Sequence, residues 1–348
     1  MKTNDFKLYP SRVEFMNSMR HPESYRAKEL LGGHILMHGD RVINWAGGFA
    51  NLYPFIQDNG NKIAVKCWCA DIDNAQSRFA KISAFFKNTD SPYFVRTQFV
   101  PDALMVSGEL YPVGIMDWVE GDSLKDYVDS QTPSKELFLD IAAKFLEMTK
   151  SIHQLNVSHG DLQHGNIMVL NGNLKLIDYD GMYVPGLDNM LDTIKGLPGY
   201  QHPARQKNKL LSPKADYFSE LVIYLSLLLF AEKPSMWADY TDTEDLLFSA
   251  YDFADLNNSD IYKEFKYSSN PKVRLLFQRM IEALSVTDIN ELHPLEDLLG
   301  NQHADIPLPK PLTPQLELMS TIIPNHNSDI IKQIDQMLEF LDNYMAAC

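Results

Sequence analysis

The stretch that most limits how this chain of 348 residues can fold is residues 159–181, which read H-G-D-L-Q-H-G-N-I-M-V-L-N-G-N-L-K-L-I-D-Y-D-G. Two short apolar runs flank an Asn-Gly-Asn turn, a pattern typical of a β-hairpin. Three polar residues stand at its ends: Asp161, Asn166 and Asp178, which are five and then twelve residues apart. The sequence therefore predicts a hairpin that carries these three side chains at its mouth.

Two carboxylates and one amide are groups that phosphoryl transfer can use. One carboxylate must orient the attacking hydroxyl, and two oxygen ligands must hold magnesium against the phosphates, because the transition state is stabilised mainly by positioning and by neutralising charge. A polar surface hairpin is the alternative interpretation, and an Asp-x4-Asn spacing alone would favour it. The second strand and Asp178 favour the chemical interpretation.

The stretch resembles the catalytic loop and the metal-binding element of the protein-kinase-like superfamily, in a bacterial-type form with an H-G-D-L-x-H-G-N loop. H-G-D-x-x-x-x-N stands where protein kinases have H-R-D-x-x-x-x-N, and I-D-Y-D stands where they have I-D-F-G. The resemblance implies that Asp161 is the catalytic base and that Asn166 and Asp178 are metal ligands.

Upstream of the hairpin, residues 41–68 read as strand, turn, strand and resemble the start of the kinase small lobe. Residues 45–50 replace the family's G-x-G-x-x-G loop, whose glycines let backbone N–H groups approach phosphates, and only the middle glycine is kept. Ala64-Val65-Lys66 matches the family's A-x-K, in which the lysine pairs with the phosphates and the alanine lies against adenine. The alternatives are an ordinary hairpin turn and a lysine that points to solvent.

Residues 113–124, which read V-G-I-M-D-W-V-E-G-D-S-L, resemble the hinge between the two kinase lobes. The resemblance makes Met116 the gatekeeper and gives residues 117–119 the backbone groups that face adenine. The nucleotide is therefore expected to contact residues of the loop, the strands and the hinge, namely Gly47, Gly48, Phe49, Ala50, Leu52, Ala64, Lys66, Met116, Asp117, Trp118, Val119 and Met168.

The largest departure from the family lies in a predicted helix over residues 73–87. Kinases place a glutamate on this helix to pair with the lysine, but residues 74–88 contain no acidic residue. A partly desolvated lysine needs an anionic partner. We therefore expect Lys66 to pair with Asp178, so that ATP and magnesium must compete for both groups and turnover is slow.

Residues 178–205 resemble the family's activation segment, because they end G-L-P-G-Y-Q-H-P-A-R where kinases have G-T-P-x-Y-x-A-P-E. Asp216 stands where the family has the aspartate that caps the catalytic-loop backbone. The lysine that serine/threonine kinases have two residues after the catalytic aspartate is Gln163 here, and the threonine that it contacts is Leu197. The joint replacement predicts a remodelled substrate side.

The residue before the catalytic aspartate bears on regulation. Kinases controlled by loop phosphorylation carry an arginine at this position, which grips the phosphate, whereas this chain has Gly160. A phosphate on Thr193 or Tyr200 would lack that partner. We therefore expect activity not to require phosphorylation of either residue.

Composition narrows the function classes further. A net charge of −15 argues against nucleic acid as a partner, since phosphate binding needs a basic surface. Three cysteines are too few for a disulfide framework, and Cys67 and Cys69 lack a second pair for a zinc site, which suggests a reducing compartment. The start does not read as a signal peptide, and the most apolar helix candidate, residues 221–231, is too short to span a bilayer, so we expect a cytoplasmic protein with no membrane partner.

These observations predict an α+β protein with a two-lobed protein-kinase-like fold. A small antiparallel-sheet lobe with one long helix is expected over residues 40–118, and a larger, mostly helical lobe over residues 119–300. Residues 1–39 are expected to form an N-terminal segment. Residues 301–348 are expected to form a Pro-rich tether and a C-terminal helical extension.

The expected function is transfer of the γ-phosphoryl group of ATP to a hydroxyl of a protein substrate, with magnesium as cofactor. Three alternatives remain open. One is a pseudokinase that binds nucleotide or a protein partner without chemistry, which the missing helix glutamate favours. Another is a small-molecule phosphotransferase similar to the aminoglycoside and choline kinases, which share H-G-D-x-x-x-x-N and often an Asp-x-Asp like that of residues 178–180. The last is an interaction scaffold without nucleotide.

Overall fold

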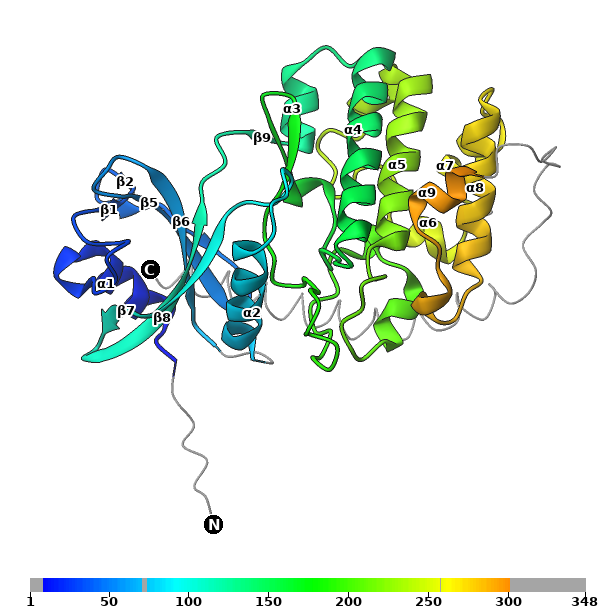
Figure 1. The fold of residues 1–348 in the computed structure, drawn as a ribbon. Coiled ribbons are helices and arrows are strands. Elements are labelled where there is room, and N and C mark those ends of the chain that lie inside the picture. The colour runs from blue at the N-terminus through cyan, green and yellow to red at the C-terminus, as the bar shows by residue number, and fades with distance from the viewer. Residues whose placement is uncertain (1–8, 71–73, 257, 301–348) are drawn as a thin grey trace, which may run out of the picture.

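A computed structural model describes residues 9–70, 74–256 and 258–300 of the chain. Two lobes lie side by side in Figure 1, a small one built around a sheet and a larger one built mostly of helices. This arrangement confirms the α+β, two-lobed fold class predicted from the sequence. The predicted Pro-rich tether and C-terminal helix lie outside the described residues.

An antiparallel sheet forms the small lobe, with the strand order β1-β5-β6-β8-β7 and with β4 paired to β5. Its strands are β1 (His34–Ile35), β4 (Trp45–Ala46), β5 (Ala50–Ile56), β6 (Lys62–Trp68), β7 (Thr97–Val106) and β8 (Glu109–Asp117). A separate short hairpin consists of β2 (Met37–His38) and β3 (Arg41–Val42).

Residues 93–100 and 103–118 read as three strands in the sequence, and the structure differs from this expectation. The structure has the two strands β7 and β8, and the interruption at Pro101 and Asp102 is a bulge inside β7, where the register shifts between Val100 and Leu104. Proline cannot donate to the strand ladder, and Asp102 adopts a left-handed φ of 49°. These two residues therefore bend one strand and do not end it.

The N-terminal segment covers one face of the small-lobe sheet. Helix α1 (Arg12–Arg20) begins at Ser11, which forms a capping box with Glu14. Phe15 and Met19 are four residues apart, so they lie on one side of the helix, and both are buried against the sheet. The N-terminal segment thus contributes a hydrophobic layer to the small lobe.

Helix α2 (Ala75–Lys87) covers the other face of the sheet, on the side of the large lobe (Figure 1). Phe79 and Ile82 are buried, and the Phe79 ring meets Trp68 of β6 edge to face at 5.2 Å between ring centroids. This apolar contact holds α2 against β6, the strand that carries Lys66.

Helices make up most of the large lobe: α3 (Leu124–Ser130), α4 (Lys135–Gln154), α5 (Tyr217–Glu232), α6 (Ala250–Ala254), α7 (Asp260–Lys266), α8 (Pro271–Leu284) and α9 (Leu295–Gly300). Short 3-10 helices connect or precede elements in both lobes: η1 (Pro22–Ser24), η2 (His164–Asn166), η3 (Pro198–Tyr200), η4 (Pro203–Lys207), η5 (Pro234–Asp239) and η6 (Ile289–Glu291). Residues 218–231 of α5 are all buried, so this helix is the centre of the lobe. Within the described residues, no helix is both long and apolar enough to cross a membrane.

The predicted hairpin is present in the large lobe, where it faces the small lobe. Strand β10 (Ile167–Leu170) pairs with β11 (Asn173–Leu176), and β9 (Asp122–Ser123) pairs with the other edge of β10. Asn171 and Gly172 connect the strands with left-handed φ values of 51° and 73°, which suit a two-residue hairpin loop. The residues on either side of the hairpin are therefore brought together at its open end, where they form the candidate site.

Candidate active site

The hairpin brings its three polar flanking residues to one place. Asn166 ends η2, and its side-chain amide donates to the backbone carbonyl of Asp161 at 2.8 Å. The backbone amide of Ile177 donates to the carbonyl of Asn166 at 3.1 Å, which draws the end of β11 and the following Asp178 to the same point. Because the Asn166 amide nitrogen is used in this way, its oxygen is the atom that remains for a metal ion.

Asp161 carries a carboxylate oxygen that is ready to accept a hydrogen bond. Its Oδ1 is buried and, among the described residues, has no hydrogen-bond partner, while the amide of Leu197 donates to the carboxylate. Burial raises the pKa of Asp161 above its ordinary value. An unpaired oxygen in such surroundings suits a group that orients a hydroxyl and takes up its proton.

Gly196 closes the site beside that oxygen. Its backbone is left-handed, with a φ of 73°, and a methyl group at this position would overlap Asp161 Oδ1. The side-chain amide of Gln201 lies next to the same point, 2.9 Å from where the methyl carbon would be. Glycine is therefore needed here both for backbone conformation and for space.

Asp216 holds the catalytic loop from the large-lobe side. Its two carboxylate oxygens accept hydrogen bonds from the backbone amides of His159 and Gly160, the latter at 2.9 Å. Asp216 is 2% exposed and directly precedes α5, the buried central helix. The loop that carries Asp161 is thus fastened to the most buried element of the lobe.

The catalytic loop and the segment after Asp178 cross at two glycines. Gly160 has a left-handed φ of 78°, and a side chain there would overlap the backbone carbonyl of Gly181. The neighbouring bridge between Ser158 and Tyr183 keeps the two segments together. Residue 160 therefore has no room for the arginine that kinases under phosphate control carry.

Lys66 of β6 is buried, with its side chain 9% exposed. Its ammonium group contacts the carboxylate of Asp180 and lies 3.6 Å from Asp178 Oδ1. Burial alone would lower the pKa of Lys66, but the nearby carboxylates, first Asp180 and then Asp178, raise it above its usual value. The contact with Asp178 agrees with the sequence-based expectation, and the closer partner, Asp180, was not anticipated.

Asp178 is the most accessible of the acids at this point, with its side chain 50% exposed. It adopts a left-handed φ of 62°, which is unfavourable for a residue other than glycine and which turns its side chain out of the β11 direction. Within the described residues, no group of three or more His, Cys, Asp and Glu side chains could hold a metal ion by itself. Asp178 and the Asn166 oxygen nevertheless fit magnesium, which takes one or two protein ligands together with substrate phosphates and water.

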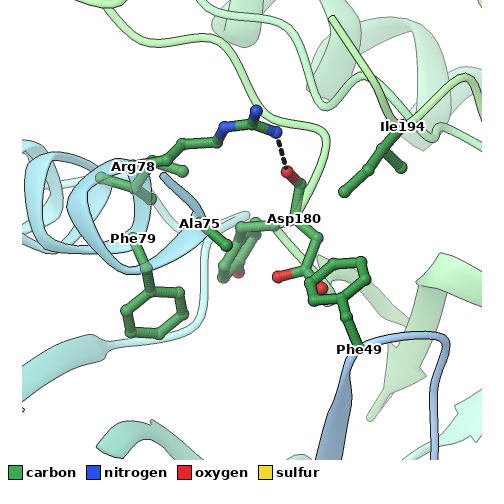
Figure 2. A pocket seen from close by; sticks show the side chains of 8 residues that line it. Phe49, Ala75, Arg78, Phe79, Asp180 and Ile194 are labelled. Carbon is green, nitrogen blue, oxygen red and sulfur yellow. Dashed lines mark hydrogen bonds between the residues drawn. The ribbon is translucent and has the colours of Figure 1, made fainter. Parts of the chain in front are cut away.

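A narrow pocket lies between α2 and the turn that contains Asp180 (Figure 2). Arg78 of α2 reaches across it and donates to the backbone carbonyl of Asp180 at 2.7 Å and to that of Leu191 at 3.0 Å. Arg78 is 3% exposed, so these bonds are shielded from water. Helix α2 is therefore tied to the segment that follows Asp178.

The loop expected to face the phosphates is a turn between β4 and β5. The amide of Gly47 donates to the carbonyl of Ala50 at 2.9 Å, which closes the turn around Gly48 and Phe49. The ring centroid of Phe49 lies 6.0 Å from the Lys66 ammonium. Arg12 of α1 donates to the Gly47 carbonyl, so the N-terminal helix supports this loop from outside.

The residues expected around adenine come from neighbouring strands. Ala64 of β6 stands opposite Met116 of β8, and Leu52 of β5 stands opposite Lys66. Met168 of β10 is half-buried and stands opposite Ser123, so the large lobe contributes from the other side. The strand register thus places Ala64 next to Met116 and Leu52 next to Lys66, and Met168 comes from the large lobe.

The hinge offers fewer free backbone groups than the sequence suggested. The amide of Asp117 donates to the backbone carbonyl of Arg96 at 3.0 Å, and that of Trp118 donates to the backbone carbonyl of Lys62 at 3.3 Å. The backbone hydrogen bonds among the described residues include none donated by the Val119 amide. Val119 is thus the member of residues 117–119 whose N–H is available to a base.

The activation-like segment is held by a buried ion pair. Arg205 is fully buried and donates to both carboxylate oxygens of Asp192 at 3.1 Å. The same guanidinium donates to Gln201, and Lys195 adds a second cation 2.9 Å from Asp192. Gln201 lies beside Gly196, so this cluster supports the wall next to the catalytic aspartate.

The positions at which the sequence departs from serine/threonine kinases make local hydrogen bonds. Gln163 accepts from the amide of Gly165 at 2.7 Å, which caps η2. His164 is hydrogen-bonded to the hydroxyl of the buried Tyr200, and burial lowers the pKa of His164 to about 4, so its ring is neutral near pH 7. The Gln163 side chain thus caps η2, and the Leu197 amide donates to the Asp161 carboxylate.

Sequence reasoning missed Asp180 and Arg78 as members of the site. A sequence signal was present. The predicted helix lacks the expected acid but carries Arg78 beside its apolar residues, and D-Y-D supplies a second acid, Asp180, two residues after Asp178. Only the fold shows that Arg78 bonds to the backbone of Asp180 and that the Asp180 carboxylate contacts Lys66.

Comparison with known proteins gives a consistent result. A family model described as protein kinase domain matches residues 45–290. A serine/threonine-protein kinase of Corynebacterium efficiens is 24% identical over 225 residues, which are 61% of this chain and 42% of that protein. The serine/threonine-protein kinase PknA of Corynebacterium glutamicum is 23% identical over 205 residues, 56% of this chain and 42% of its own. A serine/threonine-protein kinase of Candida albicans is 24% identical over 185 residues, 53% of this chain and 15% of its own. The chain spans less than half the length of these curated relatives.

Proposed function

The chain belongs to the protein kinase family, and from that premise we propose that it transfers the γ-phosphoryl group of ATP to a hydroxyl of a protein. The observation that carries this proposal is the buried, unpaired Oδ1 of Asp161 in the same site as Asn166, Asp178 and Lys66. A site that only bound a partner would not need a buried carboxylate oxygen without a hydrogen bond, because such an oxygen is costly.

Each of these residues has a role that its surroundings support. Asp161 accepts the hydrogen bond of the acceptor hydroxyl and orients its oxygen toward the phosphorus, and its raised pKa lets it take up the proton. Lys66 is an ammonium that carboxylates hold in place, and it would bind phosphate oxygens. When bound, magnesium neutralises phosphate charge, and the Asn166 oxygen and Asp178 would hold it.

Two of the three alternatives from the sequence, the pseudokinase and the small-molecule phosphotransferase, can be weighed here, and the interaction scaffold is left to the binding test below. A pseudokinase was favoured by the missing helix glutamate, but Asp180 supplies Lys66 with a carboxylate, which removes that argument. A small-molecule acceptor was favoured by the Asp-x-Asp pattern. The relatives named as serine/threonine-protein kinases support a protein acceptor instead. We also propose a cytoplasmic location and no nucleic-acid partner, in keeping with the net charge of −15.

Thermal unfolding with nucleotide tests the binding part of this proposal. ATP with magnesium should raise the melting temperature, because a ligand that binds only the folded state stabilises it. Asp178→Ala should remove most of the magnesium-dependent part of this rise. Asp161→Asn should keep the rise and abolish transfer of labelled phosphate, since it changes the group that orients the hydroxyl and leaves the phosphate-binding groups in place.

Three outcomes would count against the proposal or against one of its parts. A melting curve that millimolar ATP with magnesium leaves unchanged would remove nucleotide binding. Binding that is retained by the wild type without any phosphate transfer to general acceptor proteins would favour the pseudokinase alternative. If Asp161→Asn lost binding together with transfer, Asp161 would have a different role from the one assigned.

A further inference from the structure

The lysine of the kinase nucleotide site is usually positioned by a glutamate of the small-lobe helix. Helix α2 has no acidic residue in its sequence, yet Lys66 is buried and its charge needs an anionic partner. The carboxylate that holds Lys66 must therefore come from another part of the chain.

Asp180 is the residue that supplies it. Its carboxylate is in contact with the Lys66 ammonium, whereas Asp178 lies at 3.6 Å. The side chain of Asp180 is 19% exposed, against 50% for Asp178. The two acids therefore differ in accessibility, and the less accessible one is committed to the lysine.

Arg78 grips the same residue by its backbone. In Figure 2 the carbonyl of Asp180 faces Arg78, while its carboxylate points away from α2. A second bond from Arg78, to the carbonyl of Leu191 at 3.0 Å, ties in the segment farther along. One residue thus joins β6 through its side chain and α2 through its main chain.

We propose that Asp180 is the positioning residue of Lys66 in place of a helix glutamate, and that Arg78 holds Asp180 in place through its backbone carbonyl. This inference rests on the proposed function of the same site. It gives Asp178 a separate task, because an acid that does not have to neutralise Lys66 remains available to magnesium.

The proposal revises the expectation that magnesium must compete with Lys66 for Asp178. When Asp180 keeps its charge, Lys66 has a partner of its own. When that charge is removed, the buried ammonium must turn to Asp178, the only other carboxylate within 4 Å of it among the described residues. Loss of Asp180 should therefore appear as a defect in metal use.

Chemical modification of the nucleotide-free protein tests the pairing without any need for activity. The full chain is treated briefly with acetic anhydride at one pH, and acetylation of Lys66 is measured by mass spectrometry relative to Lys62. Lys62 is an internal standard, because it lies on the same strand and pairs with Glu120 at 3.1 Å. Asp180→Asn removes the charge, Asp180→Glu keeps it, and Asp140→Asn is a control that breaks a remote ion pair on α4.

Removal of the Asp180 charge leaves Lys66 with Asp178 alone, which is farther away and more exposed, so the Lys66 amine should become more reactive. We expect Asp180→Asn to raise the ratio of Lys66 to Lys62 acetylation about tenfold or more. Asp178→Asn should raise it less, and Asp180→Glu and Asp140→Asn should leave it near the wild-type value. An unchanged ratio in Asp180→Asn, or a larger rise in Asp178→Asn, would overturn the proposal. Asp180→Ser takes the place of Asp180→Asn if circular dichroism shows that the latter is unfolded.

Kinetics give the second test. Asp180→Asn should lower kcat and raise the magnesium concentration needed for half-maximal rate, and Asp180→Glu should restore both in part. A purely structural defect would lower the active fraction and leave the magnesium requirement unchanged, which would contradict the proposal. If the wild type transfers no phosphate, the proposed function fails, while the acetylation result still decides whether Asp180 holds Lys66.

Discussion

At the scale of single residues, Gly196 lies against Oδ1 of Asp161, with no space for a side chain between them. Gly196→Ala would push the Asp161 carboxylate out of position, and a misplacement of about 1 Å can cost about 100-fold in rate. We expect kcat to fall by about that factor while the thermal shift with ATP and magnesium is retained.

Gly186 offers a matched control for this change. It has a left-handed φ of 98° in the same segment, but among the described residues no atom lies within 4 Å of the position that a methyl group would take. Gly186→Ala therefore adds comparable backbone strain without the overlap. Equal losses of activity in both variants would show that strain, and not the displacement of Asp161, is responsible.

His153 of α4 lies between two acids, Glu220 of α5 and Glu296 of α9, at 2.8 and 2.9 Å. Burial alone would lower the pKa of His153, but Glu220 and then Glu296 raise it from 6.5 to about 9. The folded state therefore holds its proton more tightly than the unfolded state. The stabilisation is fully present below about pH 6.5 and is lost as the pH rises through about 9.

This histidine predicts the alkaline limb of the stability curve. The free energy of unfolding should fall by up to about 3 kcal/mol between pH 6.5 and 9, measured by urea denaturation. His153→Gln cannot carry the charge, so its curve should be flatter over the same range. Parallel curves for the two proteins would assign the pH dependence to other groups.

The individual residues of the site were predictable to different degrees. That Asp161, Asn166 and Asp178 lie together could be predicted, because their spacing around a hairpin is local information. The partner of Lys66 was found only in part, since the contact with Asp180 depends on the left-handed turn at Asp178 and on the placement of the small lobe. Periodicity and spacing along the chain do not carry either fact.

At the scale of elements, the segment after Asp178 is held by the buried pair of Arg205 and Asp192 and not by a surface site. Tyr200 is buried, and its hydroxyl is bonded to His164 and to the amide of Leu246, so a kinase could not reach it in the folded state. Thr193 is exposed. The structure thus places the support of this segment inside the protein.

A substitution at the buried pair should affect the protein, whereas one at the exposed threonine should not. Arg205→Met leaves a buried carboxylate with one cation fewer and should cost about 3 kcal/mol of unfolding free energy together with activity. Thr193→Ala should change neither, and phosphatase treatment of the wild type should leave activity unchanged. Denaturant titration and phosphate transfer measure both effects. Loss of activity in Thr193→Ala, with stoichiometric phosphate on Thr193 in the active wild type, would reverse this conclusion.

The elements themselves were predicted where the pattern is long and regular. The β10–β11 hairpin follows the pattern of residues 159–181 closely. The prediction of an extra strand boundary at Pro101 and Asp102 was wrong, because the same residues that end a strand also make a bulge within one. Only the partner strand β8, which continues past them, distinguishes the two.

At the scale of the whole molecule, the N-terminal segment belongs to the hydrophobic core although the kinase family model begins only at residue 45. Phe15 is 1% exposed under the sheet, while Val13 on the same helix is 59% exposed. Phe15→Ala should therefore lower the free energy of unfolding by about 3–5 kcal/mol. Val13→Ala should change it by no more than about 0.5 kcal/mol.

Denaturant titration of the two variants decides the matter. A Phe15→Ala protein as stable as the wild type would mean that α1 is an appendage and that the sheet is stable without it. In that case the Arg12 contact with the nucleotide loop would also lose its importance, because a loosely attached helix cannot hold Gly47 in place.

The crossing of Gly160 and Gly181 has a consequence for how this protein can evolve. Dependence on a phosphorylated loop requires an arginine at position 160, and one base change in many glycine codons would supply it. The Gly181 carbonyl occupies the space for that side chain, and the φ of 78° disfavours any residue but glycine. A single base change can therefore produce Gly160→Arg, but the fold has no space for the arginine side chain. Descendants of this chain can acquire control by loop phosphorylation only if both crossing segments change together.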